Sequence, residues 1–443
     1  MTDLAPTHVP RSVLLRRLYR MARHPLPTFM NYASTYGPNV ILSIVPQRVT
    51  HLTTDPAVAR HVLQRNHRNY EKSEIQSGQL GKYLGRGLLT NTGSDWLRQR
   101  RLIQPGFHRH RIRELAVSMQ DVIERECAAA AEGPVDLFAF TRRVAYRIVV
   151  RAIFTDGFSE TEAREFQANL DRLQAFVIKP IRMPTLRPVY RWTGLERRYL
   201  KLARRSRALV ADRIVRRRAA GSDHGDLLQM LLDSRYGDTA EAMSDPQLID
   251  EIMILFAAGY ETTANALAWA IYLLLRHPVQ LERLESTLRA GTTDAERPDA
   301  DDLLTHVIRE SLRLYPPAWI TDRVALEPDV AEGMTIARGT IVGVFIYGIH
   351  RSPLLYGSPD AFRPDRMTDA AMHARHPYAF LPFGGGPRRC VGDQFALLEM
   401  RMLLHHLITN YRVAALGEVP TLRPLPYVTL QQDRKLSVRL VRG

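Results

Sequence analysis

Cys390 is one of two cysteines in the chain, and its surroundings make it a candidate for chemistry. It lies in the segment 383–392, FGGGPRRCVG, directly before an apolar helical pattern. The glycines and proline predict a tight turn with amides directed at the sulfur, and a helix N-terminus lowers the pKa of a thiol. A thiolate acts as a nucleophile or as a ligand to a soft metal. A lone cysteine is more often a small buried hydrophobe, but such a residue needs neither the glycine loop nor the adjacent arginines.

A second group of reactive side chains lies in the middle of a long apolar stretch. Residues 252–275 could form a helix about 36 Å long, enough to span a bilayer, but Glu261 and two threonines lie at its centre. A carboxylate costs about 2.5–3.5 kcal/mol at the centre of a membrane. Ser244 and Gln247 also have the spacing of a capping box at a helix start. The stretch therefore predicts a long helix through the interior of a soluble protein.

The elements that must position these groups are mostly helical. Strand patterns are restricted to three regions, near 39–53, 318–347 and 427–441, and the last of these has the pattern of a hairpin. No repeat, low-complexity tract or long linker divides the chain. The expected fold is mainly α with small β-sheets, in a single domain over residues 1–443.

The composition excludes several classes of protein. Of 443 residues, 45% are hydrophobic and 24% charged, which excludes a disordered chain and a coiled-coil rod. Two cysteines exclude a disulfide scaffold and a four-cysteine zinc site. We therefore expect a reducing, cytoplasmic location.

The chain is basic, which favours an acidic partner. Its 61 Lys and Arg against 46 Asp and Glu give a net charge of +15. Nucleic acid is not expected, because no recognisable module of clustered basic and aromatic residues is present. Residues 11–23 place Leu14, Leu15 and Leu18 on one helical face with arginines opposite. We expect an ordinary packed helix there, with peripheral membrane contact at most.

The segment around Cys390 resembles the haem-binding signature of the cytochrome P-450 superfamily, F-x-x-G-x-R-x-C-x-G. Phe383, Gly386, Arg388, Cys390 and Gly392 occupy its five fixed positions. The resemblance implies the cytochrome P-450 fold, with a long central helix over haem b (iron protoporphyrin IX). It also implies that Cys390 is the axial thiolate ligand to iron, that Phe383 packs over the sulfur and that Arg388 pairs with a haem propionate.

The central helix carries a second family motif. Residues 258–263, AGYETT, fit A-G-x-[DE]-T-[TS]. Gly259 is expected to leave room for a ligand, and the hydroxyl of Thr262 to hydrogen-bond the carbonyl of Ala258 four residues earlier. By resemblance, Glu261 and Thr262 are the acid–alcohol pair that delivers the protons needed to split O2.

Two further motifs imply structural support for the cofactor. Glu310 and Arg313 fit E-x-x-R, and three-residue spacing puts them on one helical face. Arg366, within an F-x-P-x-R segment, is expected to complete a buried structural triad with them.

Propionate donors are expected from two further regions. Trp96 and Arg100 fit the family's W-x-x-x-R, and Arg323 corresponds to another propionate donor. Three histidines without metal-binding spacing are expected to be structural, namely His108, His110 and His350.

The implied activity is that of a haem-thiolate monooxygenase. It would hydroxylate or epoxidise a lipophilic fatty acid, terpenoid or polyketide with O2. The Trp96 region resembles the branch that contains fatty-acid hydroxylases, which favours fatty acids. The residues expected to line the substrate pocket are Ile75, Leu88, Phe176, Phe256, Trp319, Ile320 and Thr429.

Electrons are expected from a separate acidic ferredoxin or flavodoxin with its reductase, because the residues after Gly392 are too few for a flavin domain. Arg98, Arg101 and Arg389 are candidates for the docking face. One alternative is a peroxide-driven or electron-independent haem-thiolate enzyme, which usually lacks the acid–alcohol pair. Another is a non-catalytic haem sensor, which has no need of proton delivery.

Overall fold

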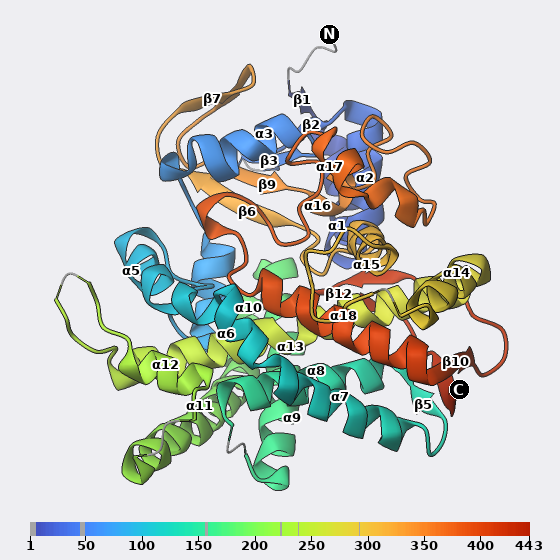
Figure 1. Cartoon of the computed structure of the whole chain (residues 1–443). Coiled ribbons are helices and arrows are strands. Elements are labelled where there is room, and N and C mark those ends of the chain that lie inside the picture. Colours follow the sequence, from blue (N-terminus) through green and yellow to red (C-terminus); the bar gives the residue numbers. More distant parts are fainter. Residues whose placement is uncertain (1–5, 45–48, 156–157, 222–223, 238, 292) are drawn as a thin grey trace.

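Helices dominate the computed structural model, which describes residues 6–44, 49–155, 158–221, 224–237, 239–291 and 293–443 (Figure 1). The α-helices have these bounds: α1 Arg11–Arg23, α2 Pro25–Tyr36, α3 Pro56–Arg60, α4 Gly81–Leu84, α5 Gly93–Ile103, α6 Arg109–Glu114, α7 Ala116–Ala130, α8 Leu137–Ile153, α9 Glu160–Arg182, α10 Arg187–Trp192, α11 Leu195–Ala220, α12 Leu227–Asp233, α13 Asp245–Arg276, α14 Pro278–Arg289, α15 Leu303–Leu314, α16 Ile346–Ile349, α17 Asp369–His373 and α18 Asp393–Asn410. The strands have these bounds: β1 Thr7–His8, β2 Asn39–Leu42, β3 Thr50–Thr53, β4 Tyr70–Glu71, β5 Val135–Asp136, β6 Thr321–Ala325, β7 Asp329–Ala331, β8 Met334–Ile336, β9 Ile341–Val344, β10 Tyr411–Ala415, β11 Pro424–Pro426, β12 Leu430–Gln432 and β13 Ser437–Arg442. The mainly helical fold with small sheets is the one expected from the sequence.

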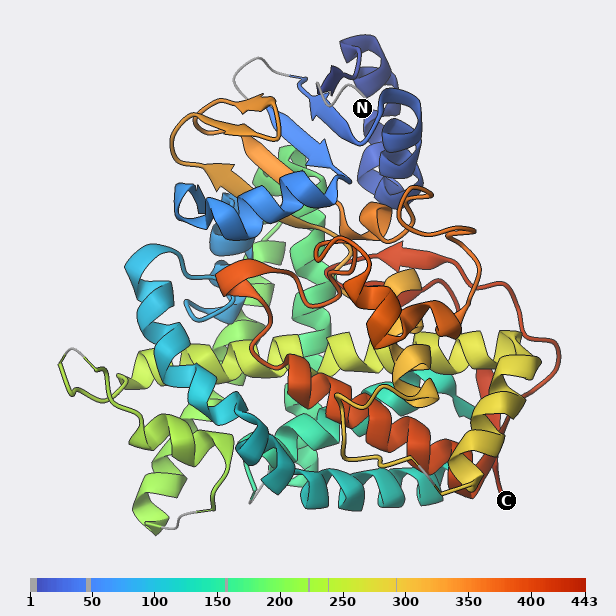
Figure 2. The same cartoon turned by 45° about the horizontal axis from the view of Figure 1, so that its top comes forward.

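The long apolar stretch forms one continuous helix, α13. Figure 2 shows α13, in yellow-green, crossing the molecule from one side to the other. It is buried on most of its surface because α8, α11, α15 and α18 pack around it. Among the described residues, no helix combines the length and apolar character of a membrane span.

The start of α13 differs from the expected capping box. Ser244 is the N-cap residue, but its side chain makes no cap hydrogen bond. The amide of Gln247 donates instead to the carbonyl of Arg86 at 2.9 Å. The expected capping box is therefore absent, and the Gln247 side chain is used in contacts with Arg86 and Glu251 instead.

A sheet of strand order β1-β2-β3-β9-β6-β4 lies apart from the main helical layer, at the top of Figure 1. Strands β3 and β9 are parallel, with Leu52 opposite Gly343. One of its faces packs on Leu14 and Tyr32 from the first two helices. The sheet therefore joins the N-terminal segment to residues 321–344, and it contains strands from two of the three regions in which strands were expected. Positions 45–48 of the expected 39–53 region lie outside the described residues.

The expected C-terminal hairpin is wrong. Strand β12 pairs with β11, whereas β13 pairs with β10 and β5. Val438 and Leu440 of β13 are buried in the main helical core, which holds that strand beside the end of α18. Burial in two different clusters therefore separates two segments that are neighbours in sequence.

Helix α1 covers the residues 11–23 predicted from the sequence. Its apolar face is divided: Leu14 is buried against the sheet, whereas Leu15 and Leu18 are exposed. Packing of this helix on the sheet therefore uses only part of that face.

Candidate active site

Cys390 ends a tight loop directly before α18. Its backbone N–H donates to the carbonyl of Phe383 at 2.9 Å. Gly386 has a φ of +68°, and a Cβ there would lie 1.7 Å from the carbonyl oxygen of Leu63. A side chain at position 386 would thus be both strained and blocked. The glycines allow the loop to pack directly on the 61–65 helical turn.

The two cysteines differ in environment. Cys390 is exposed, whereas Cys127 is buried in the helical core. The protein atoms packed around the covered part of the Cys390 thiol raise its pKa, and the backbone N–H of Gly392 and the charge of Arg100 only partly oppose this. The lowered pKa expected from the sequence is therefore wrong for the thiol alone. A thiol that coordinates a metal ion loses its proton through the metal's own charge.

One face of α13 is open near its middle. Ala258 is exposed, and Leu255, Gly259 and Thr262 are half-buried, although most of the helix is buried. Their spacing of three and four residues puts them on one side of the helix. Helix α18, which begins beside Cys390, packs against α13.

The acid and the alcohol of the central motif have different surroundings. The hydroxyl of Thr262 donates to the carbonyl of Ala258 at 2.6 Å, as expected. Glu261 is buried and accepts hydrogen bonds from Thr429 Oγ1 at 2.7 Å and Gln431 Nε2 at 2.5 Å. Burial raises the pKa of Glu261, while these two donors oppose the rise. Glu261 is therefore directed at β12, and Thr262 lies on the open face.

Gly259 has a packing role that the sequence did not indicate. A Cβ at this position would lie 3.2 Å from Cγ2 of Val149 on α8. That contact is tighter than usual, so the glycine lets α8 and α13 approach closely. The expectation that its missing side chain leaves room for a ligand stays a prediction, and the contact with α8 is a second reason for glycine at this position.

Three basic side chains, those of Lys72, Arg323 and Arg388, lie close to one another. Lys72, Arg323 and Arg388 form no ion pair among the described residues, and Arg323 is only 6% exposed. Burial, together with the charges of Arg323 and Arg388, holds the pKa of Lys72 well below its usual value. Burial also lowers the pKa of Arg323 and of Arg388 to about 10. Such a cluster fits the carboxylates of a haem. Nothing in the sequence marked Lys72, because its partners are distant in the chain.

The residues expected from the W-x-x-x-R motif lie on α5, next to the Cys390 loop. The guanidinium of Arg388 lies 4.2 Å from the centroid of the Trp96 ring. Arg100 Nη1 donates to the carbonyl of Arg389 at 2.8 Å. Helix α5 thus contacts the loop at two consecutive residues, Arg388 and Arg389.

The expected triad is assembled in the interior. Arg313 Nε lies 2.7 Å from Glu310 Oε2, with both side chains fully buried. Arg366 Nε lies 3.4 Å from Glu310 Oε1. Arg313 also donates to the carbonyls of His350 and Pro359, each at 2.7 Å. The triad therefore holds the segment that leads toward the Cys390 loop.

His350 connects the triad to that loop. Its Nε2 accepts a hydrogen bond from the backbone N–H of Leu381 at 2.7 Å, and its Nδ1 lies 3.1 Å from the carbonyl of Arg313. Burial and the Arg313 charge lower the pKa of His350 to about 3. His350 is therefore neutral and structural. His108 and His110 are exposed, and no group of metal-binding side chains of the His, Cys, Asp and Glu type occurs among the described residues.

Several residues predicted to line the substrate pocket are packed elsewhere. Phe256 is fully buried among aromatic rings that include Phe166, at 4.8 Å between centroids. Trp319 packs on Phe345 in the sheet cluster and donates from Nε1 to the carbonyl of Tyr427. These two assignments are corrected, because both rings fill hydrophobic clusters. The remaining half-buried candidates are Ile75, Leu88 and Ile320.

Two more pocket assignments change for other reasons. Phe176 is 1% exposed and stacks on Tyr199, with 3.9 Å between ring centroids. Thr429 is buried and uses its hydroxyl to donate to Glu261. Phe176 therefore packs between α9 and α11, and Thr429 belongs to the polar network of the acid.

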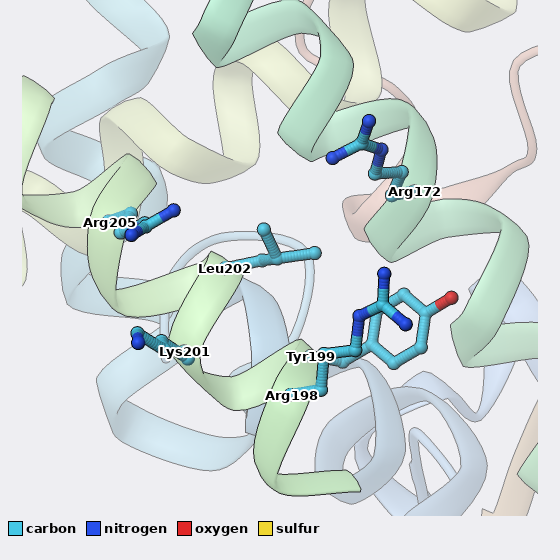
Figure 3. A pocket seen from close by; sticks show the side chains of 6 residues that line it. All are labelled: Arg172, Arg198, Tyr199, Lys201, Leu202 and Arg205. Atoms are coloured by element: carbon cyan, nitrogen blue, oxygen red, sulfur yellow. The ribbon is translucent and has the colours of Figure 1, made fainter. Parts of the chain in front are cut away.

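A basic surface pocket of about 230 Å³ lies between α9 and α11 (Figure 3). It is lined by Arg172, Arg198, Tyr199, Lys201, Leu202 and Arg205. None of these is a predicted pocket residue, so it is distinct from the open face of α13.

The predicted docking arginines have unequal exposure. Arg101 and Arg389 are exposed, and Arg389 pairs with Asp393 at 2.7 Å. The guanidinium of Arg98 is half-buried, 4.3 Å from the centroid of the Tyr236 ring. Arg98 is therefore used in internal packing, which corrects its assignment to a docking face.

Comparison with known proteins identifies the family. The family model described as Cytochrome P450 matches residues 6–438. The chain belongs to the cytochrome P450 family. Two curated relatives come from Streptomyces melanosporofaciens: cyclooctat-9-en-7-ol 5-monooxygenase is 31% identical (97% of this chain, 91% of that protein), and cyclooctatin synthase is 32% identical (93% and 90%). Pentalenene oxygenase from Streptomyces avermitilis is 30% identical (98% and 96%).

Solved structures show the same fold. The crystal structure of the haem domain named cytochrome P450DA matches with a TM-score of 0.85 at 21% identity, covering 99% of this chain and 97% of that one. This protein is thus a cytochrome P450 monooxygenase, an oxidoreductase that uses haem iron. The recognition made from the Cys390 motif is confirmed.

Proposed function

We propose that this cytochrome P450 uses haem b to oxidise a terpenoid, with Cys390 as the iron ligand. The observation that carries the proposal is the exposed thiol of Cys390 beside the helix that packs on α13, whose open face bears Ala258 and Thr262. We infer that the thiol and this face border one space. A cysteine that stays exposed at the end of a structured loop fits a cofactor ligand better than a buried structural cysteine.

The surrounding residues have complementary tasks. Trp96, Arg100, Arg323 and Arg388, together with Lys72, would bind the haem carboxylates, while Phe383 and Gly392 shape the loop. When bound, haem supplies the activation of O2 and the oxidation of the substrate. The chain orients the substrate and excludes water.

Proton delivery is assigned to the acid–alcohol pair. Thr262 Oγ1 is on the open face and would pass a proton into the space beside Ala258. Glu261 is held by Thr429 and Gln431 away from that face. Glu261 would supply the proton to Thr262 after its side chain rotates. Its raised pKa suits this role because it keeps a proton on the acid.

The relatives favour a terpenoid among the substrate classes left open by the sequence. Two of the bacterial relatives are named for cyclooctat-9-en-7-ol and pentalenene. The open face of α13 presents Leu255 and Ala258, which suit such an apolar molecule. Titration with cyclic terpene alcohols and hydrocarbons should shift the haem spectrum, whereas saturated fatty acids of 12 to 18 carbons should give weaker shifts. Tighter binding of the fatty acids would reverse the assignment.

Electron delivery is assigned to an acidic ferredoxin or flavodoxin. The net charge of +15 favours an acidic partner, and two exposed arginines lie near the thiol: Arg389 directly before Cys390, and Arg101 in the last turn of α5. Replacing both by glutamine should slow reduction by the partner, more at low ionic strength than at high. An unchanged rate would place the docking face elsewhere.

The ligand assignment is tested by the carbon monoxide difference spectrum of the dithionite-reduced protein. The wild type and the Cys127→Ser variant should show the far-red-shifted Soret band of a thiolate-ligated haem. Cys390→Ser should lose it. Cys127 is the matched control because it is the other cysteine and lies buried in the core. Retention of the shifted band by Cys390→Ser would show that another residue binds the iron.

A further inference from the structure

The loop between α4 and α5 is held by three side chains from the first turns of α13. Asp250 Oδ2 accepts the backbone N–H of Arg86 at 2.7 Å, and Glu251 Oε2 accepts that of Leu88 at 2.9 Å. Gln247 Nε2 donates to the carbonyl of Arg86 at 2.9 Å. Three backbone groups of one short loop thus depend on a helix 161 to 164 residues further along the chain.

Two glycines allow the loop to lie against these carboxylates. Gly85 has a φ of +97°, and a Cβ there would lie 2.3 Å from Asp250 Oδ1. A Cβ on Gly87 would lie 2.6 Å from Glu251 Oε2 and 2.8 Å from Ile254 Cδ1. A Cβ at either position would force the ends of these side chains to move, so the present contacts of Asp250 and Glu251 with the loop depend on the two glycines.

The three side chains are themselves fixed. Gln247 Nε2 donates to Glu251 Oε1 at 2.9 Å, and Asp250 is ion-paired with Arg207 of α11. The loop is closed on itself by Thr90, whose hydroxyl donates to the carbonyl of Gly85 at 2.7 Å. Helices α11 and α13 and the loop therefore form one linked unit.

The loop is adjacent to the open face of α13. Leu84 and Leu89, at its two ends, pack on Ile254 and Ala257, directly before the exposed Ala258. The ammonium group of Lys72 donates to the carbonyl of Leu89. The loop thus lies between the three side chains of α13 and the cations assigned to the haem carboxylates.

We propose that Gln247, Asp250 and Glu251 form a clamp on the Gly85–Leu88 loop, and that this clamp limits the entry of bulky molecules to the space beside Ala258. The proposal rests on the proposed function, in which that space receives the substrate. The three residues are positioning residues, because they act through the loop.

The charge state of Glu251 adjusts the strength of the clamp. Burial raises the pKa of Glu251 to about 8, against the hydrogen bonds from Leu88 and Gln247. The charged groups near it are Asp250 on its own helix, Arg207 of α11, which is paired with Asp250, and Arg86 of the loop, whose side chain is exposed. A carboxylate accepts from both donors, whereas a protonated acid turns its hydroxyl toward one and weakens that bond. The clamp is therefore tighter above about pH 8 than below it.

The first test is hydrogen–deuterium exchange of individual backbone amides in the haem-loaded full chain. Asp250→Ala and Glu251→Ala should speed exchange at Arg86 and Leu88 about tenfold or more, because each removes the side-chain acceptor of one of these amides. The matched control is Asp245→Ala, which removes a carboxylate of the same helix that pairs with Arg218 outside the loop. The control should leave both amides unchanged. Equal exchange rates in the wild type and in the Asp250→Ala and Glu251→Ala variants would contradict the proposal that these side chains hold the loop.

A glycine substitution gives an independent variant. Gly87→Ala should also speed exchange at Leu88, because its methyl group meets Glu251 and Ile254. Its control is Gly133→Ala, since a Cβ at Gly133 has nothing within 4 Å. No effect of Gly87→Ala would contradict the close fit on which the proposal depends.

The second test measures entry with two haem-binding probes of different size, imidazole and 4-phenylimidazole. Glu251→Ala should speed association of 4-phenylimidazole about tenfold relative to imidazole, and Asp245→Ala should leave the ratio unchanged. Faster amide exchange with an unchanged ratio of the two association rates would contradict the proposal that the clamp limits entry. A wild-type chain that shows no haem spectrum would instead overturn the proposed function, and the entry role with it.

The third test examines the ionisation of Glu251 by itself. Gln at position 251 keeps one acceptor but cannot ionise, so Glu251→Gln removes the pH dependence of the clamp. With both proteins measured at the same pH, Leu88 should exchange more slowly in the wild type than in Glu251→Gln at pH 9, and at similar rates at pH 6.5. A ratio that does not change between these pH values would contradict a role for Glu251 ionisation.

Discussion

The hydroxyl of Thr429 donates to the buried carboxyl of Glu261 at 2.7 Å, across 168 positions of the sequence. Asn265 Nδ2 donates to the same hydroxyl at 2.8 Å, which directs the Thr429 proton at the acid. The charge state of Glu261 is therefore set by a residue of the C-terminal strand region as well as by burial.

Removing this hydroxyl should raise the pKa of Glu261 further. The donor favours the carboxylate, so Thr429→Val favours the protonated acid and should move the alkaline limb of the pH profile for coupled product formation to higher pH. A hydrogen bond to a charged group contributes about 1.5–3 kcal/mol, which corresponds to a shift of about 1–2 pH units. Thr429→Ser, which keeps the hydroxyl, is the control. A shift to lower pH in Thr429→Val would contradict this arrangement.

Thr262 and its neighbour Thr263 offer a matched comparison for proton delivery. Each hydroxyl donates to the carbonyl four residues earlier, but Thr262 lies on the open face and Thr263 is buried. Thr262→Ala should keep haem binding and lower product per electron by about tenfold or more, with peroxide rising in its place. Thr263→Ala should leave the product yield nearly unchanged. Equal yields in both variants would exclude a relay through Thr262.

Lys72 should have opposite effects on the haem-free and the haem-bound protein. Without an anion, burial and the repulsion from Arg323 and Arg388 both disfavour its charged form, so Lys72→Met should raise the midpoint of thermal unfolding of the haem-free chain. The same variant should release haem faster to an acceptor such as apomyoglobin, because a carboxylate partner is lost. Lys82→Met is the control, since Lys82 pairs with Glu196 on the surface. Slower or unchanged haem release would remove Lys72 from the site.

Glu310 should be far more important for stability than an ion pair on the same helix. Glu310→Ala leaves the fully buried Arg313 without its carboxylate, which costs about 3–5 kcal/mol. Asp369→Ala breaks the half-exposed pair with Arg309 of the same helix, at 2.7 Å, and should cost at most about 1 kcal/mol. The midpoint of urea unfolding measures both. Similar midpoints would show that the triad is not the main support of this region.

Features that depend on neighbouring residues were predictable from the sequence. The turn before Cys390 follows from its glycines and proline, and the Thr262 bond to Ala258 follows from the pitch of a helix. The pairing of Glu310 with Arg313 follows in the same way from their three-residue spacing. In each case the chain brings the partners together within one turn, so no knowledge of distant packing is needed.

Other features were decided only by the tertiary structure. The sequence predicted that Phe256 and Phe176 lie near the substrate. In the structure each ring is packed in a hydrophobic cluster that includes residues from other helices. The gathering of Lys72 with Arg323 and Arg388, and the contact of Glu251 with Leu88, join segments far apart in the chain. The amino-acid sequence by itself determined the family, the Cys390 loop and the long central helix, because these depend on local backbone geometry. The direction of each buried side chain and the long-range partners of each charge depended on how the elements pack, because burial and desolvation act only after distant segments meet.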